Sequence, residues 1–280
     1  MKIWVIGANG LLGSSLYRQM PTLCVPSTKT EADIANLNSL RAFAKCHPGI
    51  THIVNCSAFS LVDLAETRRP EAHQINALGP ENLGRIAQEI QAKVVHISTD
   101  YVFPGDLLRP LHEEDFVKPL NYYGETKWEG EKRLLAALPS ACVIRTSALF
   151  GSGGKNFIAN IFRMFLEKEE ILLVDDQCNS PTFVEDLSLA IIQMLDTSGL
   201  YHFSNRGVAT KFSFVSAMYR HALQKGIPVA TKKLVAVPSS TFASLCRRPA
   251  YSVFDTSKME QRLPIRTWEE ALHSFLQGNL

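Results

Sequence analysis

The chain opens with Met1-Lys-Ile-Trp-Val-Ile-Gly7-Ala-Asn-Gly10-Leu-Leu-Gly13, and this stretch decides the fold. Residues 1–6 form a short apolar run typical of a buried parallel strand, and residues 14–20 have the pattern of a helix. In such a strand–turn–helix unit, the first glycine permits a tight turn, the next lets a pyrophosphate approach the backbone, and the third lets helix and strand pack closely. The pyrophosphate then faces the helix N-terminus, so the stretch predicts a dinucleotide site. An ordinary glycine turn is the alternative.

Strands and helices alternate along the first 150 residues. Further strands are expected at 22–26, 51–56, 93–98 and 141–145, and further helices at 36–47, 70–90 and 121–138. This alternation predicts a Rossmann-type α/β fold, a doubly wound parallel sheet with right-handed crossovers. Ligands on such sheets bind beyond the carboxyl ends of the strands. The segments that hold the candidate site residues fall at such ends: residues 7–13, 56–60, 98–101 and 146–151.

The pattern loosens after residue 150. Helices are expected at 155–170, 184–195 and 212–225, with short extended pieces between them. Because no long linker separates two units, the second part is expected to fold over the sheet as a lobe. We therefore predict an NAD(P)-binding Rossmann domain at residues 1–150 and a smaller, mainly substrate-binding lobe at 151–280, interleaved and with an approximate boundary.

Composition excludes several classes of protein. A net charge of +2 over 280 residues suggests neither a nucleic-acid binder nor a membrane-surface protein. No run is apolar and long enough to span a bilayer, and residues 1–20 do not have the form of a signal peptide. The six cysteines are scattered without a C-x-x-C pair, which predicts thiols in a reducing cytoplasm. The eight histidines show no ligand spacing, so no metal site is expected.

Tyr123 and Lys127 are separated by one helical turn and therefore lie on one face of a helix. A phenol titrates near 10 when unperturbed, and a neighbouring ammonium favours the phenolate and lowers that pKa. Such a tyrosine can deliver or accept a proton in catalysis. A Tyr-x-x-x-Lys pair alone is weak evidence, since it also occurs on solvated helices, but here it follows a dinucleotide-binding signature.

Longer strings carry a resemblance to a known family. They are Ser98-Thr-Asp-Tyr-Val-Phe-Pro-Gly105, Tyr123-Gly-Glu-Thr-Lys127, Arg145-Thr-Ser147, and Asp176-Gln177 followed by Ser180-Pro-Thr182. Together with the glycine pattern, they resemble the extended short-chain dehydrogenase/reductases, and within these the dTDP-4-dehydrorhamnose reductase family. The resemblance covers nearly the whole chain.

The resemblance implies a mechanism. Hydride would pass from NAD(P)H to the C4 ketone of a dTDP-4-keto-6-deoxyhexose. Tyr123 would protonate the developing alkoxide, the Thr99 hydroxyl would hydrogen-bond it, and Lys127 would hold the nicotinamide ribose and lower the Tyr123 pKa. The implied cofactor contacts, with the turn glycines, are Gly7, Gly10, Leu11, Leu12, Gly13, Asp33, Ile34, Ala58, Phe59, Ser60, Tyr123 and Lys127.

The resemblance also implies the substrate contacts. Thr99 and Asp100 would place the sugar, and Arg247 and Arg248 would bind its diphosphate, since guanidinium groups match phosphate oxygens. A solvated arginine doublet is the alternative. Ala148 stands where the family usually carries a tryptophan against the sugar, so a flat apolar wall is missing and the sugar itself is left open. Ser15 stands where some members carry a glutamate that supports a metal-bridged dimer, so the oligomeric state is left open too.

The second strand bears on the cofactor. NAD-selective sites usually place an acidic residue at its end for the ribose 2′-hydroxyl. Residues 25–29 read Val-Pro-Ser-Thr-Lys and contain no carboxylate there, which favours NADPH, with NADH as the alternative.

Two other polar residues receive structural interpretations. His96 lies within an expected strand and is interpreted as a packed core side chain. Asn76 resembles the helix asparagine that fixes the backbone near the active site in this superfamily, with a helix-surface amide as the alternative.

Three functions remain open at this point. The favoured one is a nucleotide-sugar reductase. The second is a non-catalytic NADP-binding regulatory protein similar to the methionine adenosyltransferase beta subunit, although such a protein has no need of Thr99, Tyr123 and Lys127 together. The third is an epimerase or a dehydratase. A dehydratase would want further acid and base groups, and Tyr101 stands where one of them is expected.

Overall fold

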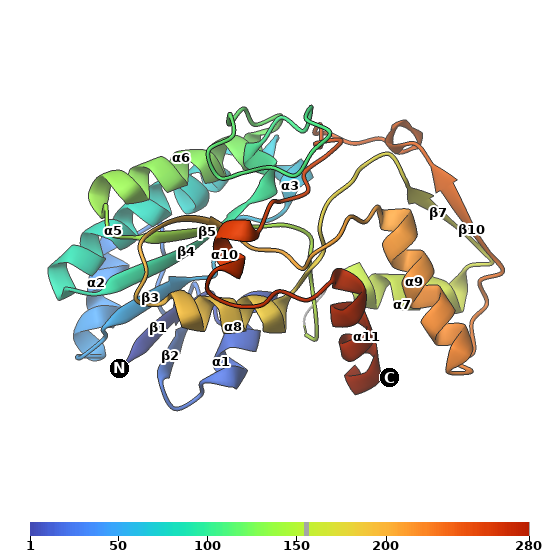
Figure 1. Cartoon of the computed structure of the whole chain (residues 1–280). Helices are drawn as coiled ribbons and strands as arrows, with labels where there is room; N and C mark the ends of the chain where they lie inside the picture. The colour runs from blue at the N-terminus through green and yellow to red at the C-terminus, as the bar shows by residue number, and fades with distance from the viewer. Residues whose placement is uncertain (154–156, 280) are drawn as a thin grey trace.

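The computed structural model describes residues 1–153 and 157–279. Within these residues, the main sheet has six parallel strands in the order β2-β1-β3-β4-β5-β9 (Figure 1). The strands are β1 (Ile3–Ile6), β2 (Cys24–Ser27), β3 (His52–Asn55), β4 (Lys93–Thr99), β5 (Cys142–Thr146) and β9 (Gly199–His202). The predicted Rossmann-type sheet is confirmed, and each of the first five strands lies within a residue or two of its expected position.

Helices cover both faces of this sheet (Figure 1). One face packs against α1 (Leu11–Gln19), α8 (Val184–Met194) and α10 (Ser257–Glu260), and the other against α2 (Leu37–Cys46), α5 (Gly79–Ile90) and α6 (Tyr122–Ala137). Successive side chains of a strand point to opposite faces. Accordingly, Val5 packs in the apolar core between the sheet and helices α1, α8 and α10. Trp4 packs in the core between the sheet and helices α2, α5 and α6.

The chain reverses its winding at β1. It steps from β1 to β2 on one side and returns to β3 on the other, with Ile6 opposite Asn55 in the β1–β3 pair. A ligand crevice is expected at such a switch point, beyond the carboxyl ends of the two strands. Gly7 and Cys56 are the first residues beyond those ends, and the Cys56 N–H still donates to the Ile6 carbonyl at 3.0 Å.

The single helix expected at 70–90 is in fact interrupted. After α3 (Val62–Ala65), the chain forms α4 (Arg69–His73), a π-helical turn η1 (Gln74–Leu78), and then α5. Pro80 has no N–H to donate to the Asn76 carbonyl four residues earlier, which removes an α-helical hydrogen bond. Single π turns of this kind are frequent at functional sites.

A lobe with its own apolar core lies beside the sheet (Figure 1). Its elements are β6 (Leu149–Phe150), α7 (Phe157–Glu167), β7 (Glu170–Val174), β8 (Thr182–Phe183), α9 (Lys211–Gln224), β10 (Lys233–Val237) and α11 (Trp268–Asn279). The helix expected at 155–170 begins on residues 155 and 156, which lie outside the described residues. Because α8, β9 and α10 return to the large sheet, the two parts are interleaved; the boundary at residue 150 stays a prediction.

Two short 3₁₀ turns complete the described elements, η2 (Asp100–Val102) after β4 and η3 (Ser239–Thr241) after β10. Across residues 1–153 and 157–279, no helix has both the length and the apolar character that a membrane span requires.

Candidate active site

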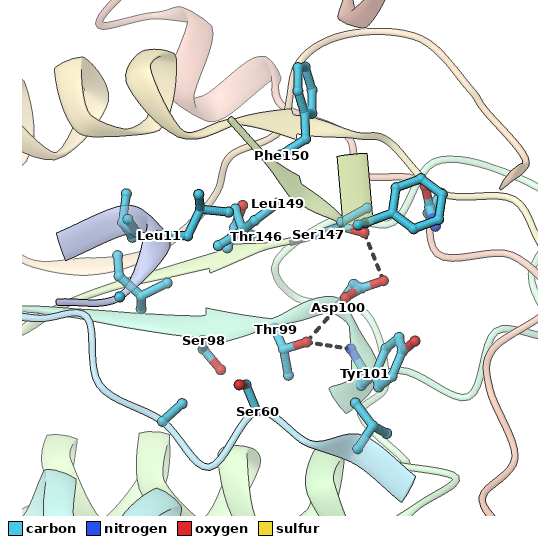
Figure 2. A pocket seen from close by; sticks show the side chains of 18 of the residues that line it. Leu11, Ser60, Ser98, Thr99, Asp100, Tyr101, Thr146, Ser147, Leu149 and Phe150 are labelled. Carbon is cyan, nitrogen blue, oxygen red and sulfur yellow. Dashed lines mark hydrogen bonds between the residues drawn. The ribbon is translucent and has the colours of Figure 1, made fainter. Parts of the chain in front are cut away.

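A cavity of about 780 Å³ opens beyond the carboxyl ends of β1, β3, β4 and β5 and extends to the lobe. Figure 2 shows the side chains of Leu11 and Ser60 on opposite sides of the end of β4. The lining includes predicted site residues from the segments after β1, β3, β4 and β5 and from α6. They are Gly7, Gly10, Leu11, Leu12, Ala58, Ser60, Thr99, Asp100, Tyr123, Lys127 and Ala148. The fold thus brings together segments that are up to 140 residues apart in the chain.

The glycine turn has the shape of a phosphate cradle. Gly7 has a φ of +79°, and a Cβ there would lie 3.0 Å from the Ser57 backbone. A Cβ on Gly13 would lie only 2.3 Å from the Gly7 carbonyl oxygen, so α1 packs directly on the turn. Helix α1 then begins at Leu11 with a glycine as its N-cap, leaving the first N–H groups without a side-chain acceptor. These features fit a dinucleotide pyrophosphate.

The loop after β3 is fixed by Asn76 in the π turn. The Asn76 amide accepts a hydrogen bond from the Phe59 N–H at 2.8 Å and donates to the Phe59 carbonyl at 3.1 Å. It also donates to the Thr126 hydroxyl at 3.1 Å, which ties the loop to α6. Asn76 is 1% exposed, so the interpretation as a surface amide is wrong. Phe59 is itself buried, and this contact presents its neighbours Ala58 and Ser60 to the cavity.

Tyr123 lies in the first turn of α6, where its helix cap places it. The Asn121 side chain accepts a hydrogen bond from the Gly124 N–H at 2.9 Å and so starts the helix just before Tyr123. The ring of Tyr123 packs edge-on against Tyr101, with centroids 5.8 Å apart. Thr99, at the end of β4, lines the same cavity, and its hydroxyl acts to lower the pKa of the Tyr123 phenol.

The expected lowering of the Tyr123 pKa by Lys127 is not found in this structure. Burial raises the pKa of the Tyr123 phenol to about 12, and the Thr99 hydroxyl opposes this only in part. The reason is geometric, since the Lys127 ammonium is turned to the Ile97 carbonyl oxygen at 2.6 Å. Burial also lowers the pKa of Lys127 to about 8, although the carboxylate of Glu131 opposes it.

Asp100 is a buried carboxyl group surrounded by hydroxyls. It is 4% exposed and accepts hydrogen bonds from Thr99 at 3.1 Å, Ser147 at 2.9 Å and Ser252 at 2.6 Å (Figure 2 draws the first two). Burial raises the pKa of Asp100, and these three donors act in the opposite direction. Its oxygens therefore hold the ends of β4 and β5 together, and its predicted role toward the sugar remains a prediction.

The turn after β5 carries an unusual backbone. Ala148 has a φ of +44°, a conformation that non-glycine residues rarely adopt and that tends to occur at functional sites. Its carbonyl accepts a hydrogen bond from the Thr182 N–H at 3.1 Å, which ties the turn to the lobe. Beyond Ala148, Leu149 and Phe150 also belong to the cavity lining, but the Phe150 ring stacks on Phe183 in the lobe core.

The two arginines lie outside the cavity lining. Arg248 donates to the Asp63 carboxylate at 2.6 Å and to the Ser244 hydroxyl at 2.7 Å, while exposed Arg247 contributes a carbonyl that accepts from Asn121. The lobe end of the cavity instead has Lys211, at the start of α9. Burial lowers the pKa of Lys211, and Arg248 acts in the same direction. This lysine lies 84 residues beyond Lys127 with no motif around it, so the sequence alone does not predict it.

Asp33 and Ile34 also lie elsewhere. The Asp33 carboxylate accepts from the Ala35 N–H at 3.0 Å, and Ile34 packs against Gly79 in the core. Residues 25–29 contain no carboxylate, but in the folded chain the carboxylate of Glu31 does lie at the end of β2. Glu31 folds back and accepts hydrogen bonds from the Thr28 N–H at 2.8 Å and from its hydroxyl at 2.9 Å.

Within the described residues, no group of three or more His, Cys, Asp or Glu side chains could hold a metal ion. Ser15 is buried between α1 and α8, where it accepts a hydrogen bond from Ser188 at 3.1 Å.

Comparisons with known proteins agree with this geometry. Residues 1–279 match the family model described as RmlD substrate binding domain. The chain is 34% identical to the spore coat polysaccharide biosynthesis protein SpsK of Bacillus subtilis (strain 168), with 99% of this chain and 97% of that protein covered. It is also 34% identical to the dTDP-4-dehydrorhamnose reductase of Escherichia coli (strain K12), at the same coverage. The crystal structure of dTDP-4-dehydrorhamnose reductase from Bacillus anthracis str. Ames in complex with NADP superposes with a TM-score of 0.93 at 33% identity, and each chain is covered completely.

Proposed function

The chain belongs to the family described as RmlD substrate binding domain, and from this premise we propose that it is a reductase that uses NADPH to convert dTDP-4-dehydrorhamnose into dTDP-L-rhamnose. The observation that carries the proposal is that Thr99, Tyr123 and Lys127 line one cavity with the glycine turn. A binding-only protein would have no need of a half-buried phenol at that place.

The residues present fit the cofactor. The N–H groups at the start of α1 would hold the pyrophosphate, and Lys127 would hold the nicotinamide ribose. Ser98 lines the same cavity, and its buried hydroxyl finds no partner among the described residues, which leaves it free to hydrogen-bond the bound cofactor. When bound, NADPH supplies the hydride that adds to the ketone carbon.

Tyr123 supplies the proton that completes the reduction. Because its pKa lies near 12, the phenol is protonated throughout the neutral range and is ready to donate to the oxygen that becomes the alkoxide. The Thr99 hydroxyl donates to Asp100 in the free protein, and it would turn toward that oxygen when substrate binds. The products are therefore the alcohol and a transient phenolate at Tyr123.

The preference for NADPH is supported by the relative crystallised with NADP. The Glu31 carboxylate is already bonded to the Thr28 N–H and hydroxyl at the end of β2, and exposed Lys29 lies beside this turn. We propose that this Glu31–Thr28 contact keeps the carboxylate away from the ribose, so that Lys29 is left to meet a 2′-phosphate.

The assay mixes the purified protein with enzymatically prepared dTDP-4-dehydrorhamnose and follows the absorbance of NADPH or NADH. We expect consumption of the cofactor, a product with the NMR spectrum of dTDP-L-rhamnose, and a lower KM for NADPH than for NADH. Tight binding of NADP without turnover would contradict the proposal and favour a regulatory protein. Turnover with a different product would keep the reductase chemistry but overturn the assigned sugar.

Lys211 is proposed to bind the substrate diphosphate, with Arg248 next to it. Lys211 and Arg247 are both exposed, but only Lys211 lies in the cavity lining. We expect Lys211→Ala to raise the KM for the dTDP-sugar by about tenfold, the effect of losing one charge-assisted hydrogen bond, while kcat changes little. Steady-state kinetics would check this, with Arg247→Ala as the matched charge loss. If Arg247→Ala raised the KM for the dTDP-sugar as much as Lys211→Ala or more, the diphosphate would be assigned to Arg247 and Arg248 instead.

We also propose that the protein works in the reducing cytoplasm. Support comes from its six cysteines, all of which are free thiols in the structure.

A further inference from the structure

A polar pair lies at the centre of the main sheet, where parallel strands are usually apolar. Asn55 of β3 stands opposite His96 of β4 in the strand register. The two residues are 1% and 0% exposed. His96 was expected to be an ordinary packed core residue, yet both of its ring nitrogens face polar atoms. Buried polar groups of this kind are retained only when their hydrogen bonds are satisfied.

The hydrogen bonds around Asn55 fix the orientation of its amide. The Ser57 N–H and the Ser57 hydroxyl both lie within hydrogen-bond distance of Asn55 Oδ1, at 3.0 and 2.7 Å. A backbone N–H can only donate, so the oxygen of the amide must face Ser57. The amide NH₂ therefore faces His96 Nδ1 at 2.9 Å and donates to it.

This orientation also fixes the tautomer of His96. Because Nδ1 accepts a hydrogen bond, a neutral imidazole must carry its proton on Nε2. Burial lowers the pKa of His96 well below its ordinary value, and the neighbouring Lys127 lowers it further, so the ring is neutral. The Nε2–H group then faces Lys127 Nζ at 3.5 Å.

When Lys127 is charged, its ammonium and the His96 Nε2–H are two hydrogen-bond donors that face each other. An ammonium has no lone pair to accept the Nε2–H, whereas a neutral amine has one. The distances agree, since Nζ stays 3.5 Å from His96 but approaches the Ile97 carbonyl to 2.6 Å. A hydrogen bond that only the neutral form can accept shifts a lysine toward that form.

We propose that His96 is a positioning residue whose Nε2–H, held in place by Asn55 and the Ser57 N–H, enables Lys127 to pass a proton to Tyr123. After Tyr123 has protonated the substrate, an N–H bond of the Lys127 ammonium breaks, and water in the cavity carries the proton to the phenolate, where an O–H bond re-forms. The neutral amine then accepts the His96 Nε2–H, and a proton taken up from bulk solvent restores the ammonium. This turnover step rests on the proposed function, whereas the tautomer of His96 does not.

Other ionisable groups surround Lys127 and are the same in all variants below. Glu131, one turn further along α6, is paired with Arg145 of β5 at 2.7 Å. Tyr123 lies one turn earlier, and Asp100 follows β4. Glu131 raises the Lys127 pKa, so it opposes the effect assigned to His96.

The first test reads the tautomer directly, in the free protein without substrate or cofactor. In protein labelled with ¹⁵N-histidine, ring-nitrogen chemical shifts distinguish protonated from unprotonated nitrogens. His202 of β9 is the internal reference, because its Nδ1 lies 3.0 Å from the Leu111 carbonyl and must be the protonated nitrogen. We expect His96 to be protonated at Nε2 and His202 at Nδ1. His96→Gln and His202→Gln assign the two signals, and a proton on Nδ1 of His96 overturns the proposal.

The second test measures the Lys127 pKa from the pH dependence of its acetylation by acetic anhydride, read by mass spectrometry. In Asn55→Asp the ring proton of His96 should move from Nε2 to Nδ1, where it donates a hydrogen bond to the new carboxylate. The Nε2 lone pair then faces the ammonium, and the Lys127 pKa should rise by about one unit. His96→Leu, which removes the donor without adding charge, should shift it in the same direction. Asn38→Asp, an exposed charge addition on α2, is the control and should leave it unchanged.

The proposal is overturned if the pH dependence of Lys127 acetylation in both Asn55→Asp and His96→Leu is the same as in the parent protein. Both tests use the free protein, so they separate its failure from that of the reductase assignment. If the reductase assay succeeds, the fall in kcat at alkaline pH should move upward in Asn55→Asp by the same amount as the acetylation profile. A shift in labelling without a shift in kcat would restrict His96 to a structural role.

Discussion

Replacing Tyr123 with phenylalanine is expected to lower kcat about 100- to 10,000-fold, the usual contribution of a positioned general acid. The ring would still pack edge-on against Tyr101, because that contact does not use the hydroxyl. What disappears is the proton donor that faces the cavity beside Thr99. The substrate ketone would then have to take its proton from water in the cavity.

Cofactor affinity separates this chemical effect from a structural one. The Tyr123→Phe protein should bind NADPH, measured by fluorescence titration, with a Kd within about threefold of the parent, since the pyrophosphate rests on the glycine turn. Tyr122→Phe is the matched control. It removes the same hydroxyl one residue earlier, where the ring lies against Arg69 and outside the cavity lining. Retained turnover in Tyr123→Phe, or an equal loss in Tyr122→Phe, would remove Tyr123 from the mechanism.

The pH dependence of kcat follows from the raised pKa of Tyr123 and the lowered pKa of Lys127. Tyr123, near 12, stays protonated over the working range, so it does not limit the rate there. Lys127, near 8, is an ammonium below that pH and an amine above it. Because the reduction needs a proton on the lysine to recharge the tyrosine, kcat should fall as the pH rises through about 8. A profile that is flat to pH 10 would show that the lysine proton is not used.

The sequence predicted the positions of the five strands and the glycine turn because these depend on local pattern. Apolar runs, turn residues and glycine spacing act over fewer than about fifteen residues, and the parallel order of the strands then follows from chain connectivity. Tyr123 and Lys127 were predicted for the same reason, since one helical turn relates them.

Features that depend on contacts between distant segments were missed. The π turn had one local signal, Pro80, but its purpose appears only when Asn76 is seen to hold the loop at Phe59. Lys211 enters the cavity from the lobe and has no motif of its own. Glu31 was overlooked because a carboxylate two residues past the expected point can fold back onto Thr28. The tautomer of His96 requires the register of β3 against β4, which no single strand contains.

The largest stability effect is expected at the buried ion pair that joins α6 to β5. Arg145 and Glu131 are 3% and 4% exposed and form two hydrogen bonds, at 3.0 and 2.7 Å. Removing one partner leaves an uncompensated buried charge, so Glu131→Gln should lower the free energy of unfolding by about 3–5 kcal/mol. The same change removes the negative charge that raises the Lys127 pKa, so any surviving activity should decline at a lower pH than in the parent.

Denaturant unfolding of a double variant decides whether the stability effect comes from the stranded charge or from lost packing. Arg145→Met with Glu131→Leu removes both charges at similar volume, and it should recover most of the stability that Glu131→Gln loses. Glu89→Gln, which breaks the half-exposed pair with Arg41, should change the unfolding free energy by less than about 1 kcal/mol. If the double variant were as unstable as Glu131→Gln, the pair would hold α6 through its hydrogen-bond geometry, and the tyrosine and lysine on that helix would depend on the ion pair for their positions.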